Sequence, residues 1–197
     1  MRRYTSPEEV AFFDAARAKP PELPALSFAP MLLGPARQNF NDALYAAYVG
    51  RVVPSICAPG DDGQHGSAAL CDITALQALS RRVHLGHFVA ERKFRDAPAR
   101  YRELVAADDV DGIMAELTNA AVEERIIERV ARKVAALGAG GAAGAGPDAD
   151  DCDGAFMVEP RTIAAIYREL IIPLTKDIEV EYLKRRIDAP DGGPEAA

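Results

Sequence analysis

Cysteine is scarce in this sequence of 197 residues, and its few cysteines follow no familiar pattern. Cys57, Cys71 and Cys152 are odd in number and show no CxxC spacing, which argues against a disulfide framework and against a zinc site. We therefore expect reduced thiols in an intracellular compartment. The three histidines have no supported metal spacing, so we expect no metal site.

Long apolar runs and an excess of positive charge are also missing. No run is long enough to span a bilayer, and the first thirty residues contain no signal-peptide core. The net charge of −7 argues against nucleic acid or an anionic membrane as a general partner. Any anionic ligand must therefore be bound by a local cluster of Arg and Lys.

The sequence lacks β-alternation of useful length and internal repeats, whereas helical periodicity is frequent. We therefore expect an all-α fold in a single domain over residues 1–197. Gly, Ala and Asp dominate 138–154, which has no Lys-Ser/Thr ending of a phosphate loop and is expected to be a flexible linker. Residues 189–197 are expected to be a frayed tail.

Proline, glycine and capping residues indicate where helices begin and end. A cap at Ser6 followed by Pro7 predicts a short helix within a proline-rich, extended segment that reaches Pro35. Asn41 and Ser67 are expected to cap the next two helices, Thr118 or Asn119 caps a later one, and Pro173 should kink the last. The expected helices are 42–57, 68–95, 98–106, 110–117, a helix ending at Gly138, and 160–187.

The stretch 76–94, LQALSRRVHLGHFVAERKF, has the apolar pattern of an amphipathic helix. Arg82 and Lys93 are eleven residues apart, which puts both cations on one face about 16 Å apart along the axis. Side chains that reach toward each other could bracket a small anion. On spacing alone, a solvated basic stripe is the alternative.

Taken with three other segments, this stretch resembles the eukaryotic chorismate mutases of plants and fungi. The matching segments are RRYTSPEEVAFF at 2–13, LQALSRRVHLGHFVAERKF at 76–94, LTNAAVEERI at 117–126 and IIPLTKDIEVEYLKRRID at 171–188. They occur in the family's order with similar spacing. The resemblance implies an all-helical homodimer that converts chorismate to prephenate, toward Phe and Tyr.

This reaction is a rearrangement within one dianionic substrate, and it requires no nucleophile, metal or organic cofactor. It requires a compact conformer held by its carboxylates and donors aimed at the ether oxygen. The resemblance implies that Arg82 pairs with a substrate carboxylate and that Lys93 donates to the ether oxygen. It also places Glu179 at that oxygen. An ionised carboxylate would repel the developing charge there, so we expect Glu179 to act as a neutral acid.

The resemblance further implies that Asn119 and Thr175 help to hold carboxylates and that Glu123 accepts from the substrate hydroxyl. Each has an alternative on local grounds. Asn119 could be only a helix cap, Thr175 could satisfy a carbonyl freed by Pro173, and the two glutamates could be exposed helix acids. His84 and His87, on the same long helix as the basic pair, are expected to be structural.

In regulated members of the family, aromatic amino acids bind between subunits. Arg2, Arg3, Gly66 and Ser67 match the positions that hold them, and a helix N-terminus with two Arg suits a carboxylate. Trp, Tyr or Phe are therefore candidate effectors. Leu70 stands where regulated members have Thr, which argues against a retained switch, and Ser67 could simply cap its helix.

The family also has a long helix before the RRYTSPEE segment, which supplies a second substrate-binding Arg and much of the dimer contact. Here Met1 immediately precedes Arg2. The alternatives are an incomplete gene model, a catalytically impaired paralogue acting as a regulatory subunit, or compensation by another cation. We expect a cytoplasmic protein, or a plastid one if a transit peptide precedes this sequence.

Overall fold

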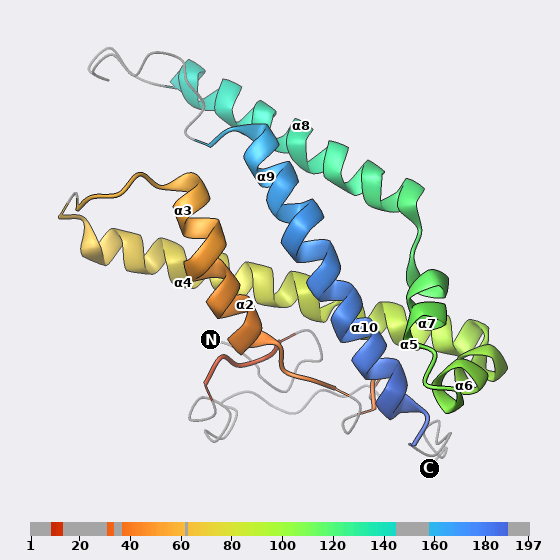
Figure 1. Ribbon diagram of the computed structural model, residues 1–197. Helices are drawn as coiled ribbons and strands as arrows, with labels where there is room; N and C mark the ends of the chain where they lie inside the picture. Colours follow the sequence, from red (N-terminus) through yellow and green to blue (C-terminus); the bar gives the residue numbers. More distant parts are fainter. Residues whose placement is uncertain (1–8, 14–30, 34–36, 62, 145–157, 189–197) are drawn as a thin grey trace.

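The computed structural model describes residues 9–13, 31–33, 37–61, 63–144 and 158–188, shown as ribbons in Figure 1. Within these residues every regular element is helical, which confirms the all-α prediction. The elements are α2 (Asn41–Ala47), η2 (Tyr48–Val52), α3 (Val53–Ile56), α4 (His65–His84), α5 (Gly86–Asp96), α6 (Pro98–Ala106), α7 (Val110–Leu117), α8 (Ala120–Gly144), α9 (Pro160–Ile166), η3 (Tyr167–Ile171) and α10 (Ile172–Arg186). The two η elements are π-helical.

The nearly continuous rod of α9, η3 and α10 organises the fold. In Figure 1 this blue rod lies across α4 and α5, while α8 runs beside α9. One apolar core joins the C-terminal half of α10 to α5, α6 and α7, and a second joins η3 and the start of α10 to α2, η2 and α4. Because α10 contributes to both cores, its position relative to α4 and α5 is fixed along its whole length.

Pro173 lies at the start of α10, directly after the π-helical segment η3. Proline has no backbone N–H to donate, and a wider turn before it removes the clash that its ring would otherwise make. Where a kink was predicted at Pro173, the structure shows a π-helical turn just before the proline, within one nearly continuous rod. The side chain of Thr175 donates to the backbone oxygen of Ile171 at 2.6 Å, so it satisfies a carbonyl at this turn.

Two predicted caps, Asn41 and Ser67, are wrong. Asn41 is the first residue of α2, not its cap, and its buried side chain donates to the backbone of Val10 and accepts from Ser80 at 2.6 Å. Ser67 lies inside the first turn of α4, which begins at His65. A cap that was not predicted occurs at Asp109, which accepts from the Gly112 backbone N–H at 2.8 Å at the start of α7.

The helix expected over 68–95 consists of α4 and α5, with Leu85 as the residue between them. Helix α8 continues to Gly144, so the prediction that it ends at Gly138 is wrong, and 138–144 is helical. The rest of the expected linker, the expected tail and Cys152 lie outside the described residues, as do residues 1–8. Residues 9–13 are not helical.

Cys57 and Cys71 are both free thiols, as expected. Among the described helices, none combines the length and the apolar character needed to cross a membrane.

Candidate active site

Two polar side chains of α10, Thr175 and Glu179, are buried against the junction of α4 and α5. Only 8% of Thr175 and 6% of Glu179 is exposed. Gly86, the first residue of α5, comes so close that a Cβ built on it would lie 2.9 Å from the backbone oxygen of Thr175 and 3.3 Å from Cγ of Glu179. The glutamate is therefore held near the C-terminal end of α4 and the start of α5.

Burial raises the pKa of Glu179 to about 7, and it is the largest influence on this carboxyl group. The positive charges of Lys93, Lys176 and Arg82 act in the opposite direction, and the negative charge of Glu123 raises the pKa further. These four charged groups come from α5, α10, α4 and α8. The structure thus gathers charges from four helices around a carboxyl group that can carry a proton near neutral pH.

Lys93 is oriented by the end of α7. Its Nζ atom donates to the backbone oxygens of Glu116 at 2.9 Å and Leu117 at 2.8 Å. These carbonyls belong to the last turn of the helix, where unpaired carbonyls favour a cation. An ammonium group has three donors, so one remains to point toward a ligand.

Arg82 lies in the last turn of α4 and is half-buried. Within the described residues, no hydrogen bond or ion pair engages its guanidinium group. The neighbouring Arg81 is different, since it donates to Glu9 at 3.3 Å and is exposed. Arg82 therefore offers a planar fork of donors on the side of Glu179.

Glu123 forms an ion pair with Lys176, at 2.8 Å between the ammonium and the carboxylate oxygen. Lys176 also donates to the hydroxyl of Thr118 at 3.0 Å, next to the start of α8. Sequence reasoning missed Lys176, although it lies beside Thr175 and one helical turn before Glu179 on the same helix. That spacing was the available signal.

Asn119, which was one of the two residues predicted to cap this helix, caps α8. Its Oδ1 atom accepts from the backbone N–H of Val122 at 3.1 Å. The side chain is exposed, and its Nδ2 group remains as a donor. Of the five predicted residues other than Glu179, Arg82, Lys93 and Glu123 act on its carboxyl group and Thr175 lies on the same helix. Asn119 lies at the exposed start of α8.

His84 and His87 are fully buried and bind the segment that precedes α2. The Nε2 atom of His84 accepts from the backbone N–H of Phe40 at 3.0 Å, and that of His87 accepts from Gln38 at 3.2 Å. Burial lowers the pKa of His84 to about 4 and that of His87 to about 3. Both rings are therefore neutral at physiological pH, in agreement with the structural role expected for them. No metal-binding cluster of His, Cys, Asp or Glu occurs in the described part of the chain.

The four residues predicted to bind an effector are only partly described. Gly66 and Ser67 lie exposed in the first turn of α4, where backbone N–H groups have no helical partner. Leu70, one turn further, is 67% exposed. Arg2 and Arg3 lie outside the described residues.

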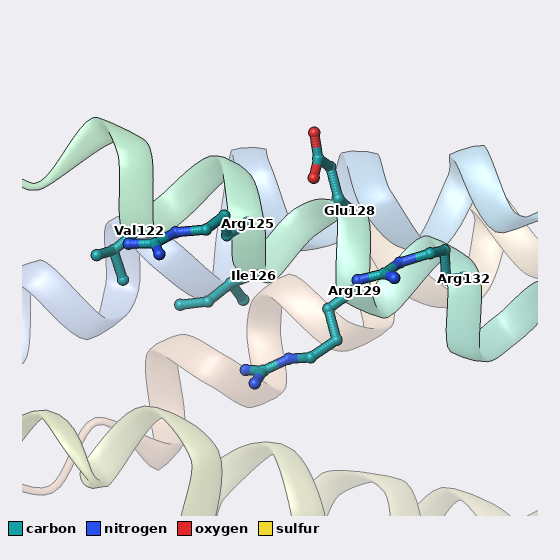
Figure 2. A pocket seen from close by; sticks show the side chains of 6 residues that line it. All are labelled: Val122, Arg125, Ile126, Glu128, Arg129 and Arg132. Carbon is teal, nitrogen blue, oxygen red and sulfur yellow. The ribbon is translucent and has the colours of Figure 1, made fainter.

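A separate hollow of about 420 Å³ lies along α8, beginning next to Glu123 in the chain. Figure 2 shows that Arg125 and Arg132 extend along the helix, whereas Arg129 points away from it on the side opposite to Glu128. Its lining residues, all on α8, are Val122, Arg125, Ile126, Glu128, Arg129 and Arg132. None of the charged groups around Glu179 lines this cationic strip, and we assign it no chemical role.

Comparison with known proteins identifies one family. The model of the family described as chorismate mutase type II matches residues 65–180. The chorismate mutase of Saccharomyces cerevisiae is 40% identical over 192 residues, which cover 95% of this chain and 71% of that protein. Relatives with similar coverage of this chain include a chloroplastic form from Arabidopsis thaliana and a cytosolic form from Zea mays.

Solved structures agree with the sequence relatives. The chorismate mutase of Candida albicans, in complex with L-Trp, has a TM-score of 0.82 and 38% identity, and the match covers 96% of this chain and 69% of that one. AtCM1 with phenylalanine in its allosteric site has a TM-score of 0.80 and 36% identity, and the match covers 94% of this chain and 71% of that one.

Proposed function

This chain belongs to the chorismate mutase type II family of isomerases, and we propose that the residues gathered around Glu179 rearrange chorismate to prephenate. The observation that carries the proposal is the convergence of Arg82, Lys93, Lys176 and Glu123 on one buried carboxyl group whose pKa is raised to about 7. In the reaction one C–O bond breaks and one C–C bond forms within a single molecule. The site must therefore bind, fold and polarise the substrate, and it exchanges no atoms with it.

The substrate is a dianion, and the site offers three cations for it. Arg82 binds one carboxylate through its fork of donors, which suits the planar group. Lys176 supplies a further cation and at the same time keeps Glu123 in place through their 2.8 Å ion pair. Glu123 accepts the hydrogen bond of the substrate hydroxyl. Asn119 assists with a carboxylate through Nδ2, a role compatible with its cap because the cap uses only Oδ1.

The ether oxygen gains negative charge as its bond to carbon breaks. Lys93 donates to this oxygen through the N–H that the α7 carbonyls do not use. Glu179 donates from the other side while it carries its proton. An ionised Glu179 would instead repel the growing charge, so the rate depends on the protonated fraction of this side chain.

Thr175 has to exchange a hydrogen bond in order to donate to a substrate carboxylate, because its hydroxyl proton is given to Ile171 in the free protein. Its oxygen remains an acceptor throughout. We therefore propose that Thr175 contributes less to binding than Arg82 does.

Conversion of chorismate to prephenate by the purified, folded chain tests this function. We expect enzymatic turnover at mildly acidic pH and a large loss of it in the Arg82→Ala variant. A folded chain whose rate equals that of the uncatalysed reaction would contradict the proposal.

We further propose that Trp, Tyr or Phe binds near Gly66 and Ser67, with Arg2 and Arg3 completing the carboxylate site. The exposed first turn of α4 supports this, as do the solved relatives with L-Trp bound or with phenylalanine in an allosteric site. Calorimetry with each amino acid should give saturable heat that is lost in a Ser67→Leu variant. The absence of heat with all three would contradict an effector site.

The assembly we propose is a homodimer, and the compartment is the cytoplasm or, alternatively, a plastid. Exposed apolar side chains on α2, η2 and α4, such as Tyr45, Val49 and Ile73, support self-association. Light scattering after size-exclusion chromatography should give twice the mass of one chain, and a purely monomeric mass would contradict this assembly.

A further inference from the structure

Gly86 occupies the closest approach between α5 and α10. A Cβ there would lie 2.9 Å from the backbone oxygen of Thr175, 3.2 Å from its Cγ2 and 3.3 Å from Cγ of Glu179. The first of these contacts is to backbone, which cannot rotate away as a side chain can. Any side chain at this position would therefore push α10 away from α5.

We propose that Gly86 is a positioning residue for Glu179: the missing side chain lets α10 approach the start of α5, and this fixes the carboxyl group relative to Arg82 and Lys93. The two cations flank Gly86 in the sequence, one turn before it and two turns after it. The proposal rests on the proposed function for its kinetic consequences, whereas the placement of Glu179 can be tested without catalysis.

Flexibility at a helix junction does not account for the glycine. Leu85, the residue between the two helices, keeps helical backbone angles, donates to Arg81 at 3.1 Å and accepts from Val89 at 3.3 Å. Gly86 is not among the described glycines with a positive φ, so its backbone conformation is open to any residue. Alanine would suit this helix better than glycine, and contact with α10 is what excludes it.

The consequence for Glu179 has a defined direction. Separating α10 from α5 admits water, and burial is the main cause that raises the pKa of this carboxyl group. The pKa should therefore fall in Gly86→Ala. Five other charged or titratable groups lie near Glu179. Lys176 is on α10 and would move with Glu179, whereas the other helices carry Arg82, Lys93, Tyr101 and Glu123.

The test compares Gly86→Ala with Gly50→Ala. Gly50 also lies in a helical segment, and a Cβ there meets no described atom within 4 Å. We expect Gly86→Ala to lower kcat by about tenfold or more, because a misplacement on the order of 1 Å costs up to 100-fold. The falling limb of its pH profile should move to lower pH. Gly50→Ala should match the wild type in both readouts.

Carbon-13 NMR titration of the Glu179 carboxyl group, assigned with Glu179→Gln, separates this proposal from the proposed function. A lower midpoint in Gly86→Ala than in the wild type supports the positioning role even if neither chain converts chorismate. An unchanged midpoint together with an unchanged kcat overturns it.

If Gly86→Ala does not fold, Gly86→Ala/Thr175→Ser replaces it, because the loss of Cγ2 at position 175 relieves one of the close contacts. A lower titration midpoint of Glu179 than in Thr175→Ser alone then supports the proposal, and equal midpoints overturn it.

Discussion

The ammonium of Lys176 lies 2.8 Å from the carboxylate of Glu123, and this ion pair joins α10 to α8 beside the buried Glu179. Lys176 and Glu123 are 19% and 26% exposed, so solvent screens the pair less than it screens a surface pair. The same lysine lowers the pKa of Glu179, while its partner raises it. The protonation of Glu179 is therefore coupled to a contact between two other residues.

Replacing Lys176 with Met should raise the pKa of Glu179, since a cation that favours its ionised form is lost. The falling limb of the rate against pH should move to higher pH, and KM for the dianionic substrate should increase. Lys184→Met is the matched control, because Lys184 lies two turns further along α10 and pairs with Asp108. A pH profile that is unchanged in Lys176→Met would contradict the coupling.

Arg82 and Arg81 are adjacent but should differ sharply in their effect on activity. A charge-assisted hydrogen bond contributes about 1.5–3 kcal/mol, so Arg82→Ala should lower kcat/KM by about 10- to 150-fold. Arg81→Ala removes a pair with Glu9 in which the arginine side chain is 52% exposed, and kcat/KM should stay within about twofold of the wild type. Steady-state kinetics of both variants decide this, and equal losses would argue against a carboxylate-binding role for Arg82.

The buried histidines should make the free energy of unfolding depend on pH. His84 and His87 have pKa values of about 4 and 3 in the folded chain, below the ordinary value of 6.5, so the unfolded chain binds protons more readily. Stability is therefore greatest above pH 6.5 and declines as the pH falls toward 4. At about 1.4 kcal/mol per pKa unit, each histidine should lower the free energy of unfolding by about 2 kcal/mol at pH 5, relative to its value well above pH 6.5.

Urea unfolding at several pH values, with the double variant His84→Gln/His87→Gln as the comparison, measures this dependence. The wild-type slope between pH 6.5 and 5 should be clearly steeper than that of the variant. Since a slope is compared, a constant loss of stability in the variant does not affect the result. Parallel slopes would show that the imidazoles do not account for the acid sensitivity.

Capping and proline residues predicted helix starts well where they act only on the first turn of their own helix. Pro98 marks the start of α6, and Asn119 caps α8 by accepting from the backbone N–H three positions on. Asn41 and Ser67 carry the same chemical signal but fail as caps. Asn41 satisfies its amide in contacts with residues about thirty to forty positions away, which outweigh the local preference.

The sequence predicted most residues of the proposed site but not the contacts among them. Family motifs pointed to Arg82, Lys93 and Glu179, and the raised pKa of Glu179 follows the expectation of a neutral acid. Lys176 and Gly86 had no motif of their own. Their roles depend on the distance between α10 and two other helices, which only the packed structure determines.

The pH dependence of chorismate rearrangement by the wild type and by Glu179→Gln tests the central claim, that neutral Glu179 donates to the ether oxygen. Because the folded pKa of about 7 leaves the acid protonated below that pH, wild-type turnover should fall as the pH rises through 7. The amide that Glu179→Gln introduces donates at every pH, so the profile of this variant should be nearly flat. A variant that keeps the wild-type limb would contradict this role for Glu179.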